Sequence, residues 1–276
     1  MNKAYKKIIG ITGSTGTLGK SFIKQYKNKF IFKCYKDRIE NISEFKKWII
    51  TNKNIDFFLH FAAISTISES KKKNTLNINT KSTIVILKLI NKLRLNNLKY
   101  FLFASSSHVY KPSKKKLNEN AQRLPVNKYG LSKKKVEDFI FINRKKFYFK
   151  IGICRIFNFY SKNQKKGFFI YDMIEKISNS LKFAKIYKIN TERDYIKAKQ
   201  LSEMIYFLIK KEITQVVNLG SGKKINLINI IKMIKKKHKL KIKLLLEKTR
   251  YNGLVADINF LRKLGYKKKI QSFKYE

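Results

Sequence analysis

Three glycines stand out first among the residues whose spacing could do chemistry. In the segment GITGSTGTLGKSF, Gly13, Gly16 and Gly19 lie three apart, directly after an apolar run and before an amphipathic stretch. In a strand-to-helix turn, the first glycine permits the tight turn, the second lets the backbone approach a pyrophosphate, and the third lets the helix pack closely. The N-terminus of the helix then faces the phosphates. Ordinary turns also contain glycines, but the flanking strand and helix patterns favour a dinucleotide-binding loop.

A carboxylate stands where such a loop requires one. Dinucleotide folds hold the adenosine ribose hydroxyls with an acidic residue after the second strand, roughly 20 residues beyond the glycines. Asp37 follows Gly19 by 18 residues. Its neighbours Lys36 and Arg38 are basic, and a base at this site can instead accept a 2′-phosphate. Asp37 therefore favours NAD and leaves NADP open.

A tyrosine and a lysine form the third element of this chemistry. Tyr129 and Lys133 are four residues apart in NKYGLSKKKVEDF, so on a helix they share one face. A free tyrosine titrates near 10, and a neighbouring ammonium lowers the pKa of the phenol toward the range of a general acid or base. Ser105, Ser106 and Ser107 end an apolar run and offer a hydroxyl partner. Each pattern is common in isolation, and their joint order after the glycine loop gives them weight.

The secondary-structure elements that must position these residues are predicted to be alternating strands and helices. Short apolar runs, each followed by an amphipathic stretch, indicate a parallel sheet covered on both faces. We therefore expect an α/β fold, a Rossmann-like doubly wound parallel sheet at 1–157, with a small C-terminal substrate-binding lobe at 158–276 from which some chain returns to the sheet. The expected strands of the sheet are 7–12, 30–35, 56–62, 100–105 and 149–157.

Composition limits the other possibilities. The 276 residues include 64 basic and 17 acidic side chains, a formal charge of +47, which is typical of nucleic-acid binding. The basic runs are dispersed, however, and the abundance of Lys, Ile, Asn, Phe and Tyr is typical of AT-rich codons, so we favour compositional drift. The sequence has no apolar run of membrane-spanning length and no signal peptide, which predicts a cytoplasmic protein. Cys34 and Cys154 lie in separate apolar segments without metal-ligand spacing.

Taken together, these motifs resemble the extended short-chain dehydrogenase/reductases, the NAD-dependent epimerase/dehydratase group that acts on sugar nucleotides. The resemblance covers nearly the whole chain and is specific for the fold rather than for the substrate. The matching segments are TGSTGTLG (12–19), DFFLHFAA (56–63), NINTKST (77–83), SSSHVY (105–110), LPVNKYGLSK (124–133), RIFNFY (155–160), RDYI (193–196), VVNLGSG (216–222) and ADINFLRKLGY (256–266).

The resemblance implies a catalytic role for three side chains. Tyr129 corresponds to the general acid/base, and Lys133 to the residue that lowers its pKa and holds the nicotinamide ribose. Ser106 corresponds to the hydroxyl that polarises the reacting sugar oxygen. The expected cofactor contacts, besides Tyr129 and Lys133, are Gly13, Gly16, Thr17, Leu18, Gly19, Asp37, Ala62 and Asn79, with a packing role as the alternative for the last two.

The resemblance also implies a nucleotide-sugar substrate. Asn158 and Arg193 align with groups that contact its diphosphate, and Arg250 is a candidate for a second phosphate clamp. His108 stands at a variable position where relatives place an extra acid or base, so it either titrates during the reaction or lines the pocket as a neutral ring. A helix-pair homodimer is the usual assembly of the family.

Departures from the family pattern reduce the number of reactions that the chain is expected to catalyse. The 4,6-dehydratases carry an Asp-Glu pair directly after the catalytic hydroxyl, where this chain has Ser107 and His108, so dehydration is disfavoured. Lys111, Ser161 and Gln200 replace residues that are usual in the family, which leaves a weakened site open. A 4-epimerase and a 4-keto sugar reductase both fit, with hydride transfer at C4 and Tyr129 as acid/base. The alternative from another class is a weakened member that binds RNA through its basic surface.

Overall fold

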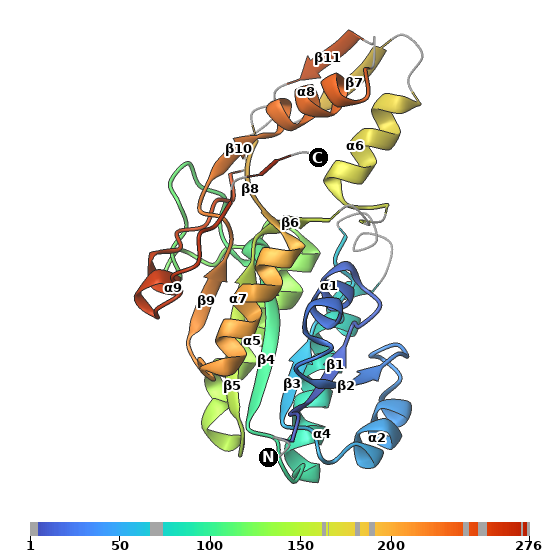
Figure 1. Ribbon diagram of the computed structural model, residues 1–276, viewed down its shortest axis with the longest axis vertical. Coiled ribbons are helices and arrows are strands. Elements are labelled where there is room, and N and C mark those ends of the chain that lie inside the picture. Colours follow the sequence, from blue (N-terminus) through green and yellow to red (C-terminus); the bar gives the residue numbers. More distant parts are fainter. Residues whose placement is uncertain are drawn as a thin grey trace.

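The chain folds into a larger body and a smaller lobe, which lie one above the other in Figure 1. This computed structural model describes residues 5–66, 74–161, 164, 166–179, 183–187, 191–239, 243–247, 253–271 and 273–274. Arg250, one of the expected phosphate ligands, lies outside the described residues. Within them, no helix is long and apolar enough to cross a membrane.

The larger body is built on a six-stranded sheet whose described pairings are all parallel. The strands lie in the order β2-β1-β3-β4-β5-β9. Their bounds are β1 Ile8–Thr12, β2 Ile31–Tyr35, β3 Phe57–His60, β4 Tyr100–Ser106, β5 Lys150–Ile156 and β9 Val216–Leu219. The first five confirm the strands expected from the apolar runs to within two residues at each end. β3 and β4 are buried along their whole length, as strands covered on both faces must be.

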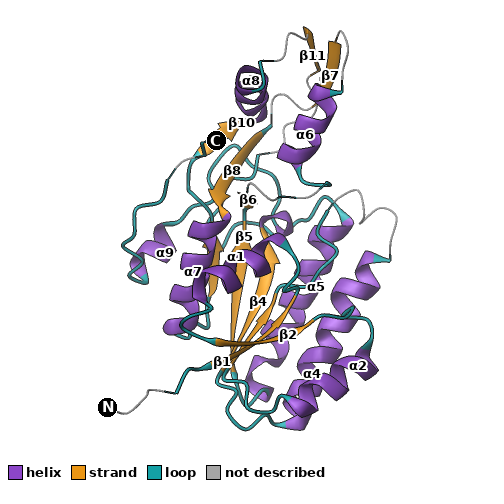
Figure 2. Ribbon diagram, turned by 45° about the vertical axis from the view of Figure 1, so that its right-hand side comes forward, coloured by secondary structure: helices purple, strands orange, loops and turns teal. Residues whose placement is uncertain are grey.

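Helices cover both faces of the sheet (Figure 2). α1 and α7 pack against each other on one face, while α2, α4 and α5 pack in sequence on the other, so each face encloses its own apolar core. The helices of this body are α1 Thr17–Tyr26, α2 Ile42–Thr51, the π-helical turn η1 Asn77–Ser82, α4 Thr83–Leu93, the 3₁₀ turns η2 Ser107–Val109 and η3 Arg144–Lys146, α5 Lys128–Asn143, α7 Ala198–Lys210 and α9 Asn259–Lys263. This arrangement confirms the expected Rossmann-like α/β fold.

The smaller lobe is formed by segments after the fifth strand. It contains a three-stranded sheet in the order β10-β8-β6, a parallel pair β11-β7, and two helices with a separate small core. The bounds are β6 Asn158–Tyr160, α6 Phe169–Ser178, β7 Phe183–Tyr187, β8 Glu192–Lys197, β10 Lys224–Asn226, α8 Leu227–Lys237 and β11 Lys243–Glu247. Between β8 and β10 the chain passes through α7 and β9 of the larger body. The domain boundary after residue 157 stays a prediction.

The topology fixes where a site can form. β2 lies on one side of β1 and β3 on the other, so the loops that follow β1 and β3 diverge at the carboxyl edge of the sheet. In open α/β sheets, ligands bind in the crevice at such a switch point. The glycine loop follows β1, and Ser106 ends β4 at the same edge.

Candidate active site

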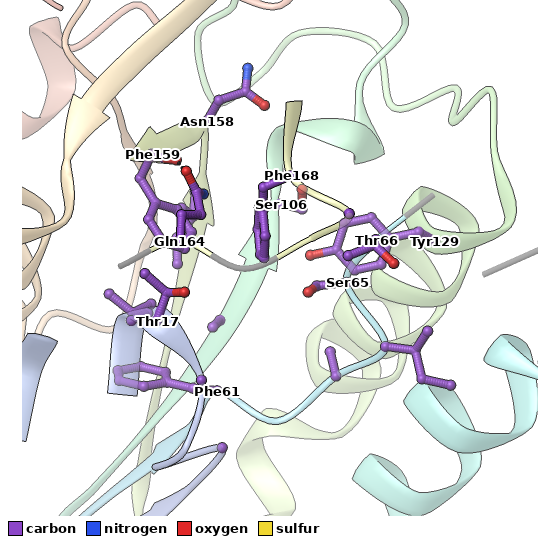
Figure 3. A pocket seen from close by; sticks show the side chains of 18 of the residues that line it. Thr17, Phe61, Ser65, Thr66, Ser106, Tyr129, Asn158, Phe159, Gln164 and Phe168 are labelled. Atoms are coloured by element: carbon purple, nitrogen blue, oxygen red, sulfur yellow. Dashed lines mark hydrogen bonds between the residues drawn. The ribbon is translucent and has the colours of Figure 1, made fainter. Parts of the chain in front are cut away.

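One cavity of about 920 Å³ runs from the glycine loop to the small lobe. It is lined by Gly13, Gly16, Thr17, Leu18, Gly19, Asp37, Ala62, Ser106, His108, Tyr129, Lys133, Asn158 and Arg193. The structure thus brings together, around one cavity, nearly all the site residues expected from the sequence. Figure 3 shows Tyr129 and Ser106 with Asn158 above them and Thr17 toward the glycine loop.

The backbone of the glycine loop lies very close to neighbouring backbone atoms. Gly13 has a φ of +74°, and a side chain there would bring Cβ within 2.6 Å of the Ala62 backbone nitrogen. A Cβ at Gly19 would lie 2.3 Å from the Gly13 carbonyl oxygen. At Gly16 the nearest atom would be 3.3 Å away, so that position is the least confined of the three. Close packing therefore requires the first and third glycines, and the approach of a pyrophosphate to the second stays a prediction.

The N-terminus of α1 has the electrostatic features of an anion-binding site. Its N-cap, Gly16, provides no side-chain hydrogen bond, and the first turn holds no acidic residue. The first backbone N–H groups of a helix have no partner within the helix, and they carry the positive end of its dipole. They are therefore available to a phosphate group.

Asp37 lines the cavity two residues after the end of β2. Its carboxylate accepts hydrogen bonds from the Arg38 backbone N–H at 2.7 Å and from the Asn41 amide at 2.9 Å. These two hydrogen bonds, with that from Asn41 the stronger influence, lower the pKa of Asp37. Arg38 itself is paired with Glu40. The carboxylate is thus held in its charged form beside a guanidinium that already has an acidic partner.

Ser106 and Tyr129 meet at the centre of the cavity. Burial raises the pKa of Tyr129 to about 12, against the opposing effect of a hydrogen bond with the Ser106 side chain. Ser106 also accepts a hydrogen bond from the His108 backbone N–H at 3.3 Å. At neutral pH the phenol is therefore protonated. This direction is opposite to the lowered pKa expected from the sequence, because desolvation of the phenol outweighs its polar contacts.

Lys133 shares the helix face of Tyr129 as its spacing predicts. Its ammonium lies 5.9 Å from the centre of the Tyr129 ring and 4.8 Å from that of Phe103. It donates a hydrogen bond to the Ala104 carbonyl at 2.7 Å. Burial lowers the pKa of Lys133 to about 8. The lysine thus joins α5 to β4 directly beneath the catalytic candidates.

The small lobe supplies the other end of the cavity. Asn158 at the start of β6 and Arg193 on β8 both line it. Two buried polar atoms here have no hydrogen-bond partner, the Asn158 side-chain nitrogen and the Thr191 hydroxyl. Thr191 is fully buried and also lines the cavity. Unsatisfied buried polar atoms beside a guanidinium are consistent with a site that a polar, anionic ligand completes.

Sequence reasoning missed Thr191 although a signal was present. Thr191 stands two residues before Arg193, and alternate residues of an extended segment point to the same side. Thr66 and Phe168, which also line the cavity, carried no comparable signal. The fold brings the chain just before Phe168 against Thr66, since a Cβ at Gly167 would lie 2.8 Å from the Thr66 methyl carbon.

Asn79 is placed differently from the expectation. It is buried, and it does not line the cavity. Its amide bonds the backbone of Ile64 in both directions, at 2.8 and 3.0 Å, and donates to the Ser132 hydroxyl at 3.2 Å. It therefore holds the loop after β3 against α5. These hydrogen bonds support the packing role that the sequence left as the alternative for Asn79, and a cofactor contact stays a prediction.

The three departures from the family pattern lie away from this cavity. None of Lys111, Ser161 and Gln200 is among its described lining residues. Gln200 donates a hydrogen bond to the Lys269 carbonyl at 3.2 Å, and Lys111 is exposed. Their substitution thus leaves the lining of the cavity as it is.

Comparison with known proteins places the chain in a family. Residues 8–264 match the family model described as GDP-mannose 4,6 dehydratase. The chain belongs to this family. This family is a branch of the NAD-dependent epimerase/dehydratase enzymes, which are extended short-chain dehydrogenase/reductases that act on sugar nucleotides. The motifs in the sequence predicted this membership.

Two curated relatives of this family are oxidoreductases by name. The dTDP-4-dehydro-6-deoxyglucose reductase of Escherichia coli is 28% identical over 96% of this chain and 93% of its own. The GDP-6-deoxy-D-talose 4-dehydrogenase of Aggregatibacter actinomycetemcomitans is 24% identical over 77% of this chain and 74% of its own.

Solved structures of the family share the fold. The UDP-glucose 4-epimerase of Bifidobacterium longum, in complex with NAD+ and UDP, superimposes with a TM-score of 0.81 at 21% identity, covering 97% of this chain and 94% of that one. Another structure with this fold, RMD from Pseudomonas aeruginosa, was solved with NADPH. The cofactors in these structures are of the class that the glycine loop predicted.

Proposed function

We propose that this chain is an NAD(P)-dependent enzyme that transfers hydride at C4 of a nucleotide-linked sugar, and that it acts as a reductase of the 4-keto form. The observation that carries the proposal is the hydrogen-bonded pair of Ser106 and Tyr129 between a dinucleotide cradle and a polar, cationic pocket. A hydroxyl pair at that position can bind and protonate a sugar oxygen.

The residues present fit the cofactor. The absence of a side chain at Gly16 and the uncapped start of α1 suit a pyrophosphate, and Asp37 suits ribose hydroxyls. When bound, the nicotinamide would supply or accept the hydride. We propose NAD(H) over NADP(H), since the Asp37 carboxylate repels a 2′-phosphate and Arg38 is engaged by Glu40.

The protonated state of Tyr129 is compatible with reduction of a keto group. A phenol with a pKa of about 12 holds its proton at neutral pH. A reductase needs that proton at the keto oxygen as the hydride arrives at C4, whereas an oxidation must begin by removing it. Ser106 would donate to the same oxygen and polarise the carbonyl. Proton supply by Tyr129 and activation by Ser106 together describe a keto reduction.

The substrate end supports a nucleotide diphosphate. Arg193 offers a guanidinium, and Asn158 and Thr191 offer buried polar atoms without protein partners. Guanidinium groups recognise phosphate oxygens in a bidentate manner. We assign these three residues to the diphosphate or the adjoining sugar. Arg250 remains a candidate for a second phosphate contact.

Reduction is favoured over the other reactions of the family. The two curated relatives described above, which cover 77% and 96% of this chain, are a 4-dehydrogenase and a 4-keto sugar reductase. Dehydration lacks its acidic pair, since Ser107 and His108 stand there. A 4-epimerase, which keeps the reduced cofactor and returns the hydride to the other face, is the second candidate. The RNA-binding alternative has no support among the relatives named above.

The test begins with the cofactor and ends with the sugar. Mass spectrometry of small molecules released from purified, denatured protein shows whether a nicotinamide cofactor is retained. NADH and NADPH oxidation is then followed with dTDP- and GDP-linked 4-keto-6-deoxyhexoses, beside isomerisation assays with UDP-glucose and UDP-galactose. We expect cofactor oxidation with a 4-keto sugar. Isomerisation with a retained cofactor would replace the reductase proposal by the epimerase, and no reaction with either set would refute both.

We further propose a cytoplasmic homodimer. Both cysteines are free thiols, which suits a reducing compartment. Val85 on α4 and Ile142 on α5 are 39% and 78% exposed, so this helix pair presents apolar side chains at the surface. Sedimentation equilibrium of the wild type and of Ile142→Glu tests the dimer, and an unchanged monomer mass in both would refute it.

A further inference from the structure

Asn127 stands between the start of helix α5 and the ring of His108. Its side-chain oxygen accepts a hydrogen bond from the Gly130 backbone N–H at 2.8 Å, which makes Asn127 the N-cap of α5. Its side-chain nitrogen lies 3.0 Å from Nδ1 of His108. One amide thus contacts both the helix that carries Tyr129 and the histidine that lines the cavity.

The hydrogen bond to Gly130 determines the orientation of the Asn127 side-chain amide, that is, where its oxygen and its nitrogen lie. The Gly130 N–H is a donor, so the atom facing it must be the amide oxygen. The amide nitrogen, which is only a donor, is then the atom that faces His108. Nδ1 of His108 must accept, and an accepting Nδ1 carries no proton. The neutral ring therefore has its proton on Nε2.

The surroundings hold His108 in place. A Cβ at Gly130 would lie 2.1 Å from the His108 carbonyl oxygen, so the first turn of α5 packs directly on this backbone. The ring meets the Tyr129 ring edge to face at 5.8 Å. Burial, with the nearby Arg193 charge as a second cause, lowers the pKa of His108 to about 4. At physiological pH the ring is neutral.

We propose that Asn127 is a positioning residue that fixes His108 as the Nε2–H tautomer, so that His108 presents a neutral hydrogen-bond donor to a substrate oxygen. The group it would bind is a hydroxyl or carbonyl oxygen of the nucleotide-linked sugar, and this identity rests on the proposed function. Of the two roles open from the sequence, the geometry points to the neutral one. A ring held in this way orients the sugar beside Ser106 and Tyr129 without exchanging a proton with it.

Two substitutions separate this role from helix capping. Asn127→Asp keeps an N-cap oxygen for Gly130 but turns the group facing His108 from a donor into an acceptor, which requires a proton on Nδ1. Asn127→Ser also keeps a cap, but its shorter hydroxyl leaves Nδ1 without its donor. Asn226→Ser is a matched control, because Asn226 caps α8 in the same way, by accepting from the Ile228 N–H at 3.0 Å.

The readout is nitrogen NMR of protein labelled in its three histidines, with His108 assigned by the loss of its signals in His108→Gln. In the wild type and in Asn226→Ser at pH 7, we expect an unprotonated Nδ1 and a protonated Nε2. In Asn127→Asp we expect Nδ1 to gain a proton, and in Asn127→Ser a mixture of the two tautomers. A wild-type ring protonated on Nδ1, or a tautomer unchanged by Asn127→Asp, would overturn the proposal.

Kinetics connect the tautomer to the substrate. With the sugar nucleotide found active, Asn127→Asp should lower kcat/KM about tenfold or more, the worth of one good hydrogen bond. Its melting temperature should stay close to that of the wild type, and Asn226→Ser should keep full activity. Unchanged kcat/KM in Asn127→Asp would contradict the substrate contact. The NMR experiment needs no substrate, so it tests the tautomer even if the proposed reaction is not found. A failure of the proposed function and a failure of the tautomer assignment are therefore distinguishable.

Discussion

The Lys133 ammonium donates its hydrogen bond to the main-chain carbonyl of Ala104 at 2.7 Å, not to the phenol of Tyr129. Ala104 lies in β4, two residues before Ser106, and Lys133 lies one helical turn after Tyr129. The lysine therefore joins the strand that carries one candidate catalytic hydroxyl to the helix that carries the other. Its positive charge is held within reach of the cavity at a cost in desolvation.

That desolvation predicts a pH-dependent stability. Burial lowers the pKa of Lys133 from 10.5 to about 8, so between these values the unfolded chain binds more protons than the folded one. The free energy of unfolding of the wild type should therefore rise with pH across this window relative to Lys133→Met, by about 3 kcal/mol in total. Urea unfolding of both proteins at pH 7.5, 9 and 10.5 measures the difference. A difference that stays constant with pH would contradict a buried, charged lysine.

Replacing Tyr129 tests the proton donor. Tyr129→Phe keeps the ring and removes the hydroxyl, so kcat should fall by a factor of about 10² to 10⁴. Binding of NADH, measured by fluorescence titration, should be little changed, because the glycine loop and Asp37 remain. Tyr171→Phe is the matched control, since Tyr171 is 39% exposed on α6. Turnover that survives in Tyr129→Phe would assign the proton to another group.

Asp37 should determine the choice of cofactor. Asp37→Asn removes a negative charge at the expected ribose site while its neighbours Lys36 and Arg38 remain. The affinity for NADPH relative to NADH should then rise about tenfold, because a 2′-phosphate no longer meets a carboxylate. Glu44→Gln makes a similar change of charge outside the cavity, where Glu44 pairs with Lys47, and should leave the ratio unchanged. Equal ratios in wild type and Asp37→Asn would remove Asp37 from the cofactor site.

The sequence was sufficient for the parts of the molecule that depend on local pattern. The first five strands were predicted to within two residues because each is a nearly continuous apolar run bounded by polar segments. The tight packing at Gly13 and Gly19 was predicted because backbone geometry alone decides it. The common face of Tyr129 and Lys133 followed from helical spacing in the same way.

The features that the sequence did not predict depend on tertiary contacts. The pKa of Tyr129 was expected to fall, but its burial, which spacing does not reveal, raises it. Asn79 stands at a position typical of a cofactor contact, yet its amide turns toward Ile64 and Ser132. The capping oxygen of Asn127 is visible in sequence, whereas its second contact to His108 requires a loop 19 residues earlier to return beside it.

A second buried histidine predicts how the fold responds to acid. His60 is fully buried at the end of β3, where its ring nitrogens bond the hydroxyls of Thr12 and Thr83, each at 2.9 Å. Burial, with the Lys133 charge as a second cause, lowers the pKa of His60 to about 3, and that of His108 falls to about 4. As pH falls from 6.5 to 5, both histidines gain protons in the unfolded chain and stay neutral in the folded one, so stability is lost.

The difference in bound protons between the unfolded and folded chains approaches two for these two rings, so the free energy of unfolding falls by up to about 3 kcal/mol for each pH unit. Replacing one ring, as in His60→Gln, should reduce the slope of unfolding free energy against pH by about half of that amount. Thr83→Val removes one hydrogen bond but leaves His60 buried, so its slope should match the wild type even if its stability is lower. Urea unfolding at intervals between pH 6.5 and 5 gives all three slopes. If Thr83→Val flattened the slope as much as His60→Gln, hydrogen bonding rather than burial would be the cause of the shifted pKa.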